Sequence, residues 1–335
     1  MKALTLVDTG KVEIREVAEP ARGNGEVLLK VEMVGLCGTD LNSFRGRNPL
    51  ISFPRILGHE IAATVLEGTA ELAAGTRVTV SPYTACGVCA SCRQSRENAC
   101  RNNQTFGVQR DGALTELLSV PIGKVYASTL RLKHLCIVEP LTVGFHAVAR
   151  GRVTREDVVA VFGCGGIGLG AIAGAAFRGA RTIAIDLDDT KLATAAAAGA
   201  TDVIHSARED VRAKLREMTD GHGPDVIIEA IGLPETFRMA VEEVAFTGRV
   251  IYIGYAKEPV AYETKLFVQK ELDIMGSRNA LPQDFREVMT MLAAGQFPVD
   301  AAVTAIVALD KAPGILAEWS ANPAAFTKIM VNLRA

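Results

Sequence analysis

The sequence has no surplus of charge of either sign. Its 335 residues include 36 lysines and arginines against 38 aspartates and glutamates, which leaves a formal net charge of -2. A protein that holds a phosphate backbone needs a cationic surface, and this composition offers no excess of cations from which to build one. We therefore expect no nucleic-acid partner.

Long apolar runs are also scarce. The first residues reach Asp8 before any apolar stretch of signal-peptide length has formed, so we expect a cytoplasmic protein. Residues 158–177 carry no charge and contain spaced glycines, a pattern also found in close-packed membrane helices. Their β-branched and aromatic start, followed by Gly163 and Gly165, instead favours a strand, a turn and a helix. We expect no membrane partner.

Aromatic residues make up only 5% of the chain, whereas 49% of the residues are hydrophobic and 22% are charged. This balance is typical of a globular protein, and the length favours two domains. Residues 1 to about 145 contain short strand-like runs such as 26–31 and 77–80, separated by glycine and proline turns, so this half is predicted to be mostly β.

From about residue 153 the pattern changes to strands that alternate with helices. The helices are marked by stop and start signals, such as Arg178-Gly179, Gly199 and Pro234. Such alternation predicts an α/β fold with a doubly wound parallel sheet. A helix at 284–294 and a strand at 328–333 follow, and we expect this tail to rejoin the first domain. The predicted strands of the sheet are 158–163, 181–187, 202–206, 224–231, 248–254 and 272–277.

Cysteine is sparse outside one segment. Four of the seven cysteines form the pattern C-x2-C-x2-C-x7-C within residues 82–104, a loop with few large apolar residues. Four thiolates in a short loop can close a tetrahedron around zinc, which predicts a structural metal site; an iron–sulfur cluster is the alternative. The four are Cys86, Cys89, Cys92 and Cys100, and the others are Cys37, Cys136 and Cys164.

A glycine-rich turn follows the first strand of the predicted parallel sheet. The segment 163–168 fits G-x-G-x-x-G and opens a helix, so its free N–H groups are expected to face the pyrophosphate of a dinucleotide. Asp186 ends the next strand, where its carboxylate favours NAD over NADP; the alternative is a helix-capping aspartate. Lys191 either reaches the same ribose or lies on a solvated helix face. The predicted residues of the turn are Gly163, Gly165, Gly166, Ile167 and Gly168.

Three further candidates for metal binding are dispersed along the chain. They are Cys37 in Gly-Leu-Cys-Gly-Thr-Asp, His59 in Gly-His-Glu, and Glu139 in Val-Glu-Pro. Taken singly, each has an ordinary structural interpretation: a small buried hydrophobe, a hydrogen-bonded core histidine and a carboxylate at a helix N-terminus. Their spacing alone does not join them.

Together with the four-cysteine segment and the glycine turn, this ordered set resembles the zinc-containing medium-chain dehydrogenases, above all the branch of sorbitol and threonine dehydrogenases. The resemblance implies a GroES-like, mostly β catalytic domain over residues 1–145 and 281–335, a Rossmann NAD-binding domain over 146–280, and a homodimer or homotetramer. It also implies two zinc ions per chain. The catalytic zinc would be held by Cys37, His59 and Glu139, with Glu60 as an exchanging or outer carboxylate.

The same resemblance implies the chemistry. Zinc with an open position activates a hydroxyl, Thr39 accepts its proton, and hydride passes to NAD+ to give a ketone. The family often has histidine where this chain has Asn42, and an amide does not relay a proton in the same way.

Substrate choice depends on fewer residues. Ser277-Arg278-Asn279, with Arg45, Arg47 and Asn48, resembles dehydrogenases of sugar acids such as L-galactonate and L-gulonate, which belong to carbohydrate metabolism. Arg278 would bind a carboxylate, with Asn279 beside it; alternatively Arg278 covers a helix or a subunit contact. Polyols and L-threonine are the next candidates for this small polar substrate. A catalytically silent zinc-binding or regulatory protein is the alternative of another class.

Overall fold

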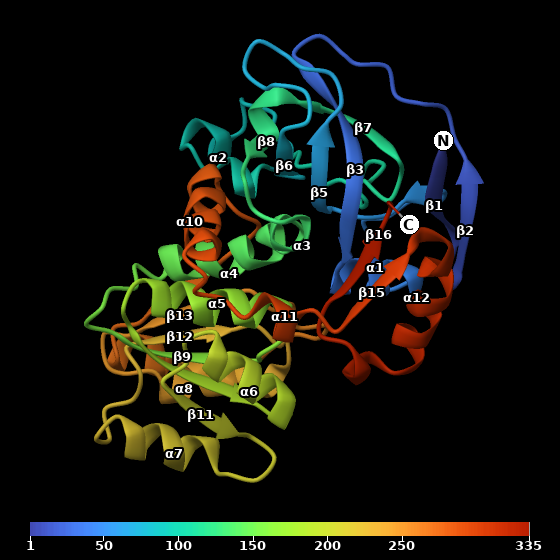
Figure 1. Cartoon of the computed structure of the whole chain (residues 1–335). Helices are drawn as coiled ribbons and strands as arrows, with labels where there is room; N and C mark the ends of the chain where they lie inside the picture. The colour runs from blue at the N-terminus through green and yellow to red at the C-terminus, as the bar shows by residue number, and fades with distance from the viewer. Residues whose placement is uncertain (335) are drawn as a thin grey trace. The chain divides into compact units, whose positions relative to one another are not determined.

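The computed structural model describes residues 1–334, which form two compact units (Figure 1). The first comprises Met1–Glu139 together with the chain from Val299 onward, and the second comprises Pro140–Pro298. Within residues 1–334, no helix is both long and apolar enough to cross a membrane. The uncharged stretch 158–177 is instead a strand and a helix.

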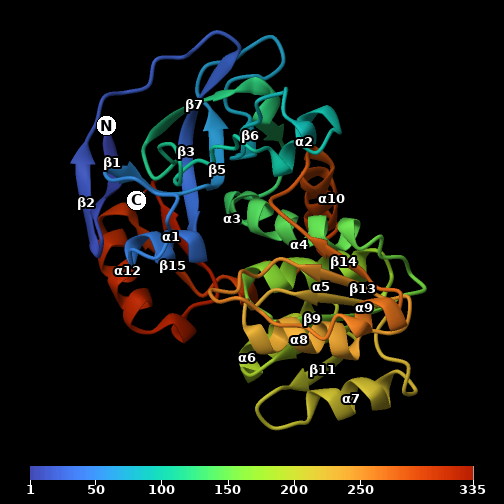
Figure 2. The ribbon, with the colours of Figure 1, turned by 180° about the vertical axis from the view of Figure 1, so that it is seen from behind.

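The first unit is built on two sheets. The smaller one has the order β2-β1-β4, and the larger one has the order β15-β16-β3-β5-β6-β8, with β7 paired to β3. From Val299 onward the tail lies in this unit, where β16 pairs antiparallel with β3; Figure 2 shows this C-terminal segment in red beside the blue N-terminal strands. The strands are β1 (Lys2–Asp8), β2 (Lys11–Glu16), β3 (Glu26–Leu36), β4 (Arg55–Ile56), β5 (Glu60–Val65), β6 (Arg77–Val80), β7 (Leu117–Pro121), β8 (Val125–Ala127), β15 (Ala305–Ala308) and β16 (Ile329–Asn332).

Alternating side chains of these strands meet in one hydrophobic core, which includes Leu4, Leu29, Val34 and Ile61. Trp319 belongs to the same core, so the C-terminal helix is held against the N-terminal strands by apolar burial. The helices of this unit are α1 (Gly38–Phe44), α2 (Ala90–Arg93), α3 (Leu132–Cys136), α11 (Val299–Ala302) and α12 (Ala312–Ala321), with short 3-10 turns at Glu97–Ala99, Ile122–Lys124, Leu309–Lys311 and Pro323–Ala325.

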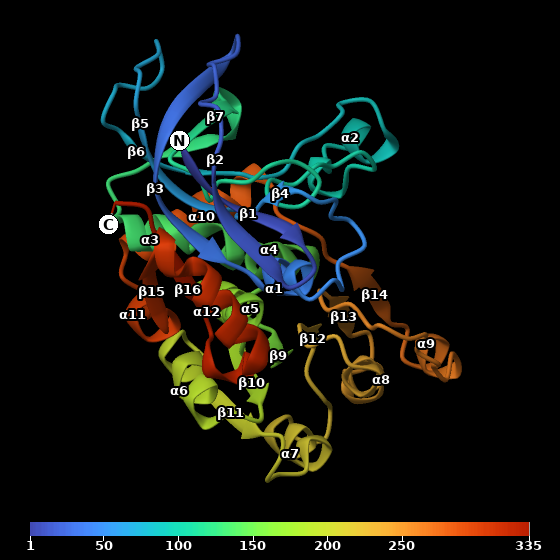
Figure 3. The ribbon, with the colours of Figure 1, turned by 90° about the vertical axis from the view of Figure 1, so that its right-hand side faces the viewer.

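The second unit is a six-stranded parallel sheet of order β11-β10-β9-β12-β13-β14, which confirms the predicted doubly wound α/β fold. All six predicted strands are present. Figure 3 shows α5 and α6 on one side of this sheet and α8 and α9 on the other. The strands are β9 (Val158–Phe162), β10 (Arg181–Asp186), β11 (Asp202–His205), β12 (Val226–Glu229), β13 (Arg249–Tyr252) and β14 (Asp273–Gly276).

Local signals set the helix limits in this unit. Asp188 and Asp210 accept backbone N–H groups at the starts of α6 and α7, and Pro234 occupies the first turn of α8, as predicted. The helices are α4 (Val138–Arg150), α5 (Gly166–Phe177), α6 (Asp189–Ala197), α7 (Val211–Met218), α8 (Pro234–Glu243), α9 (Lys265–Gln269) and α10 (Pro282–Ala293).

Helix α10 belongs to the second unit, whereas the boundary expected after residue 280 assigns it to the catalytic domain. Two contacts attach it there. The buried His146 Nδ1 lies 2.9 Å from Asp284 Oδ2, and Arg178 pairs with Glu287 at 3.0 Å. The sequence shows the helical pattern of 284–294 but not the surface against which that helix packs, which explains the difference.

Candidate active site

The ends of two neighbouring strands bring together three of the predicted metal ligands. Cys37 follows β3 directly and is the first residue before α1, and Glu60 opens β5, where it pairs with Gly35 of β3. His59 precedes Glu60 in the chain. The Cys37 sulfur, a ring nitrogen of His59 and a carboxylate oxygen of Glu60 all lie within 4.8 Å of one another. These three residues are called the ligand cluster below.

The absence of a side chain at Gly35 makes room for this arrangement. A Cβ atom at position 35 would lie 1.9 Å from Glu60 Oε2, far inside van der Waals contact. The carboxyl group of Glu60 therefore lies over the backbone of β3 only because that position is glycine.

Lys328 supplies a cation that the sequence analysis did not identify. It lies just before β16, and its Nζ donates hydrogen bonds to Glu60 Oε1 at 2.5 Å and to the Leu36 carbonyl at 3.3 Å. Burial works against the charge on Lys328, but the Glu60 carboxylate raises its pKa above the ordinary value. No local pattern marks this lysine, because its partner is 268 positions away in the chain.

Glu139 lies in the first turn of α4, outside the ligand cluster. The hydroxyl of buried Tyr83, in the loop after β6, donates a hydrogen bond to Glu139 Oε1. Burial raises the pKa of Glu139, and His59 and Glu60 are close enough to act on the same carboxyl group. Tyr83 was also missed from the sequence; it lies just before the four-cysteine segment, where only its proximity to that motif was a signal.

The buried acceptors of this region match a metal cation. Asp40 Oδ1, His59 Nδ1 and Glu60 Oε2 are all buried without a hydrogen-bond partner, and buried polar atoms normally have one. The first two lie 4.0 Å from each other, beyond hydrogen-bond distance. Although burial opposes the charged imidazole, Asp40 and Cys37 raise the pKa of His59. Sulfur, imidazole nitrogen and carboxylate oxygen form the donor set that zinc prefers. The residues present therefore fit a zinc ion.

Thr39 lies beside the cluster, in the first turn of α1. Its Oγ1 is 3.8 Å from the Cys37 sulfur, and the residue is half-buried, so the hydroxyl has access both to the cluster and to solvent. Asn42, on the same helix, is exposed.

The four sulfurs of the second cysteine group also lie within 4.8 Å of one another. Backbone N–H groups of Cys86 and Asn102 each donate to the Cys100 sulfur at 3.3 Å. Hydrogen bonds from Ser91 and from the backbone N–H of Cys92 lower the pKa of Cys89 to about 5. Such donors favour thiolates, the form of cysteine that binds metal, so this loop fits a closed tetrahedral metal site.

The glycine turn has the geometry of a phosphate-binding loop. Gly163 has a φ of 94°, in the left-handed region that favours glycine. A Cβ at Gly165 would meet nothing within 4 Å, whereas one at Gly168 would lie 1.7 Å from the Gly163 carbonyl oxygen. Helix α5 begins at Gly166 and includes Ile167 in its first turn, where the N–H groups have no acceptor within the helix.

Asp186 lies at the carboxyl end of β10, next to this turn. Its Oδ2 accepts the backbone N–H of Cys164 at 2.8 Å, and its Oδ1 accepts that of Leu187 at 2.8 Å. Asp188, not Asp186, caps α6 by accepting the N–H of Lys191 at 3.0 Å. The alternative of a capping role therefore applies to Asp188. Asp186 keeps its carboxylate at the nucleotide edge of the sheet, with half-buried Lys191 in the adjacent helix turn.

The predicted substrate residues are divided between the two units. Arg278 is exposed just after β14, and Asn279 beside it has a φ of 52°. In the first unit, Arg45 donates to the hydroxyl of Ser320 at 3.1 Å and to its carbonyl oxygen. Arg45 therefore links α1 to α12, which sequence patterns do not reveal.

Asn48 has a similar structural role. Its Nδ2 donates to Ser43 Oγ at 2.9 Å, and its Oδ1 accepts the N–H of Leu50 at 3.1 Å. Arg47 is exposed. Of the three polar residues at 45–48, two therefore have contacts within their own domain that account for them.

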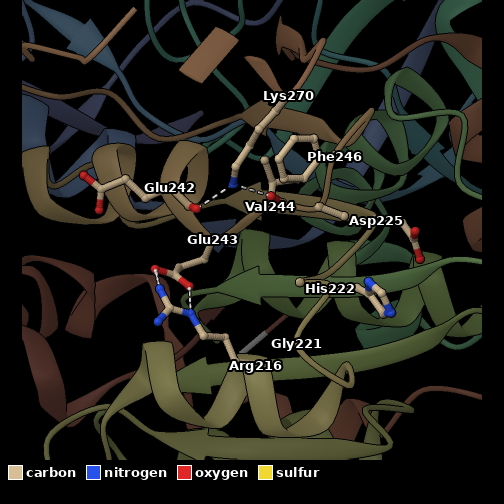
Figure 4. Close-up of a pocket in the computed structure, with 11 residues that line it drawn as sticks. Arg216, Gly221, His222, Asp225, Glu242, Glu243, Val244, Phe246 and Lys270 are labelled. Atoms are coloured by element: carbon tan, nitrogen blue, oxygen red, sulfur yellow. Dashed lines mark hydrogen bonds and ion pairs between the residues drawn. The ribbon is translucent and has the colours of Figure 1, made fainter. Parts of the chain in front are cut away.

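A cavity of about 490 Å³ opens at the amino ends of β12 and β13, the sheet edge opposite the glycine turn (Figure 4). Two of its cationic side chains have partners within this unit. Lys270 Nζ donates to the carbonyl oxygens of Glu242 and Val244 at 2.6 and 2.7 Å, and Arg216 pairs with Glu243 at 3.1 Å. None of the predicted site residues lines it.

Comparisons with known proteins agree with this geometry. Residues 23–129 match the alcohol dehydrogenase GroES-like domain, and residues 166–294 match the zinc-binding dehydrogenase family. An L-galactonate-5-dehydrogenase of Escherichia coli K12 is 34% identical over 289 residues, which cover 85% of each chain.

Two solved structures each cover 99% of this chain. One is a zinc-binding dehydrogenase of Sinorhizobium meliloti 1021 bound to NADP, with 31% identity, a TM-score of 0.91 and 98% of its own length covered. The other is an alcohol dehydrogenase of Escherichia coli CFT073 with NADH, with 26% identity, a TM-score of 0.91 and 99% covered. The chain thus belongs to the zinc-containing medium-chain dehydrogenases and is an NAD(P)-dependent oxidoreductase that acts on alcohols or polyols.

Proposed function

We propose that this enzyme oxidises a secondary hydroxyl of a sugar acid, of the L-galactonate or L-gulonate type, with NAD+, and releases a keto acid. The observation that carries the proposal is the ligand cluster of Cys37, His59 and Glu60, in which His59 Nδ1 and Glu60 Oε2 are buried without a hydrogen-bond partner. The similarity to an L-galactonate-5-dehydrogenase supports the substrate class. We also propose a cytoplasmic homodimer or homotetramer, which light scattering of the purified protein tests.

Each chain would hold two zinc ions. Cys37, His59 and Glu139 would hold the catalytic ion, with Glu60 as the exchanging carboxylate, and the four cysteines of 86–100 would hold the structural ion. When bound, zinc supplies Lewis acidity that stabilises negative charge on the substrate oxygen, and NAD+ supplies the hydride acceptor.

The residues of the chain then have distinct tasks. Thr39 accepts the proton of the substrate hydroxyl and passes its own proton to water, because Asn42 carries an amide that does not relay a proton as an imidazole does. Tyr83 fixes the orientation of the Glu139 carboxylate. Lys328 balances the charge of Glu60, so that this buried carboxylate is not left unpaired.

The dinucleotide would lie along the carboxyl edge of the parallel sheet. The first-turn N–H groups of α5 would face the pyrophosphate, and the open space at Gly165 would admit it. Asp186, held by the backbone N–H groups of Cys164, Leu187 and Asp188, would accept the hydroxyls of the adenosine ribose. A 2′-phosphate would meet this negative charge, so we propose NAD as the preferred cofactor.

For the substrate carboxylate we propose Arg278, with Asn279 beside it. A neutral polyol is the second candidate, and one observation favours it: Arg45, an arginine counted toward a sugar-acid site, is already engaged by Ser320. L-threonine, a hydroxy-amino acid, is a further candidate substrate.

The decisive experiment is a substrate panel of hexonates, polyols and hydroxy-amino acids, read as NADH formation by the zinc-loaded enzyme. Highest efficiency with a hexonate supports the proposal. Highest efficiency with sorbitol or another neutral polyol would replace it with the second candidate. Absence of NADH formation across the panel, with two zinc ions bound per chain, would instead support a catalytically silent zinc protein.

A further inference from the structure

We propose that Asp189 is a second determinant of cofactor choice, because it occupies the guanidinium of Arg208 that would otherwise bind a 2′-phosphate. The inference rests on the proposed preference for NAD through Asp186. It adds a residue that acts from the start of α6, one position after the capping Asp188.

The ion pair is bidentate. Arg208 NH1 donates to Asp189 Oδ1 at 3.0 Å, and NH2 donates to Oδ2 at 2.8 Å. Both carboxylate oxygens thus accept from one guanidinium, and His205 Nε2 also lies 3.7 Å from Oδ1. The hydrogen bond from Arg208 lowers the pKa of Asp189, which favours the charged form of the carboxylate.

The pair lies next to the proposed ribose acceptor. In the parallel pairing of β10 with β11, His205 is the partner of Asp186. The N–H of Ser206 donates to the Asp186 carbonyl at 2.9 Å, and the N–H of Arg208 donates to the His205 carbonyl at 2.9 Å. Arg208 therefore lies in the turn that continues from the residue paired with Asp186, at the edge where the adenosine ribose would bind.

Arginine is suited to a phosphate, because its planar fork matches two oxygens at once. Here the same fork already faces Asp189, and Asp186 adds a second negative charge at the end of the strand that precedes α6. An exposed ion pair is weak on its own. If only Asp186 or only Asp189 loses its carboxylate, the other still repels a 2′-phosphate. If both lose it, Arg208 is free to bind the phosphate. The two substitutions should act together and not additively.

The test is a set of NADH and NADPH dissociation constants, measured by nucleotide fluorescence on the zinc-loaded protein. We expect Asp186→Ser to strengthen NADPH binding by a few-fold, and the double variant with Asp189→Asn to strengthen it by about a further tenfold. Adding Arg208→Gln to the double variant should remove this further gain.

Asp202→Asn is the matched control. Asp202 pairs with Arg181 at 3.0 Å, at the opposite ends of the same two strands, so its substitution removes one negative charge without approaching the ribose. Combined with Asp186→Ser, it should not strengthen NADPH binding further. Melting curves of all variants report whether the fold is kept.

Each failure has a distinct meaning. If the wild type binds NADPH as tightly as NADH, the proposed NAD preference is wrong. If that preference holds but the double variant binds NADPH no better than Asp186→Ser alone, the role of Asp189 is wrong. If the gain survives Arg208→Gln, or appears equally with Asp202→Asn, it reflects loss of net negative charge and not release of Arg208.

Discussion

Lys328 and Glu60 form a buried ion pair, with Nζ 2.5 Å from Oε1, that joins the first and last parts of the chain inside one unit. The pair leaves the second carboxylate oxygen of Glu60 without a hydrogen-bond partner. One side of the carboxyl group is thus fixed by the protein, and the other remains available to a cation in the ligand cluster.

Replacing Lys328 should lower the free energy of unfolding substantially. Lys328→Met would leave Glu60 buried and unpaired, and breaking a buried pair in this way costs about 3–5 kcal/mol. The exposed pair of Lys133 with Asp300 offers a control, since Lys133→Met should cost about 1 kcal/mol or less. Melting curves of both variants measure the two losses. Equal losses of stability would show that the buried pair stabilises the fold no more than the exposed pair does.

Removing the Tyr83 hydroxyl should weaken metal binding without unfolding the protein. Partners that orient a metal ligand typically contribute about 10- to 100-fold in affinity, so Tyr83→Phe should release zinc to a chelator at correspondingly lower chelator concentrations. Tyr262→Phe, which removes a hydroxyl bonded to Tyr252 in the second unit, is the control. Identical zinc retention in both variants would contradict an orienting role for Tyr83.

The two proposed zinc sites should respond differently to loss of a ligand. Cys100→Ser removes a buried sulfur from the four-cysteine loop and should lower the melting temperature and the zinc content. Glu139→Ala should abolish turnover while the fold is kept. Metal analysis, melting curves and activity of both variants provide the comparison, and a fully stable, active Cys100→Ser protein would exclude a structural metal in this loop.

Arg278 should contribute to kcat/KM mainly for substrates that carry a carboxylate. A hydrogen bond to a charged group contributes about 1.5–3 kcal/mol, so Arg278→Gln should lower kcat/KM for a hexonate by roughly 10- to 100-fold. The loss with an uncharged polyol of the same configuration should be much smaller. Equal losses with both substrates would mean that Arg278 does not bind the carboxylate.

The buried Glu229 should make stability depend on pH. Burial raises the pKa of Glu229, although the N–H of Gly232 and the hydroxyl of Thr236 donate to its Oε1 and partly oppose this shift. A folded-state pKa above the ordinary 4.5 means that the folded protein holds this proton more tightly than the unfolded chain. Its contribution to stability is complete below the unfolded value and is lost as the pH rises through the folded value.

The glutamine of the Glu229→Gln variant carries no titratable proton, so this variant should not lose stability in this way as the pH rises. As the pH rises above the ordinary value of 4.5, the melting temperature of the wild type should therefore fall relative to that of Glu229→Gln. Glu217→Gln, on an exposed carboxylate paired with Lys214, is the control for a charge that stays in water. A difference between wild type and Glu229→Gln that stays constant with pH would contradict the prediction.

Sequence reasoning succeeded where the information is local. The parallel strands follow from alternation, and the glycine turn is recognisable because Gly163 and Gly168 lie close in the chain as well as in space. It failed where a contact joins distant segments. Neither Lys328 nor Tyr83 lies in a local sequence pattern that indicates its partner. The contact of Arg45 with Ser320 is also absent from the sequence pattern, because it depends on how α1 packs against α12.

The glycine opposite Glu60 ties the chemistry of the site to the alignment of the sheet. In the observed register Gly35 faces Glu60, and its neighbours on β3 are Val34 and Leu36. A slip of one residue between β3 and β5 would place a branched side chain where the carboxyl group now lies. A chain that folds with these strands misaligned would therefore lose the metal centre along with the sheet, so that zinc binding reports on correct strand pairing.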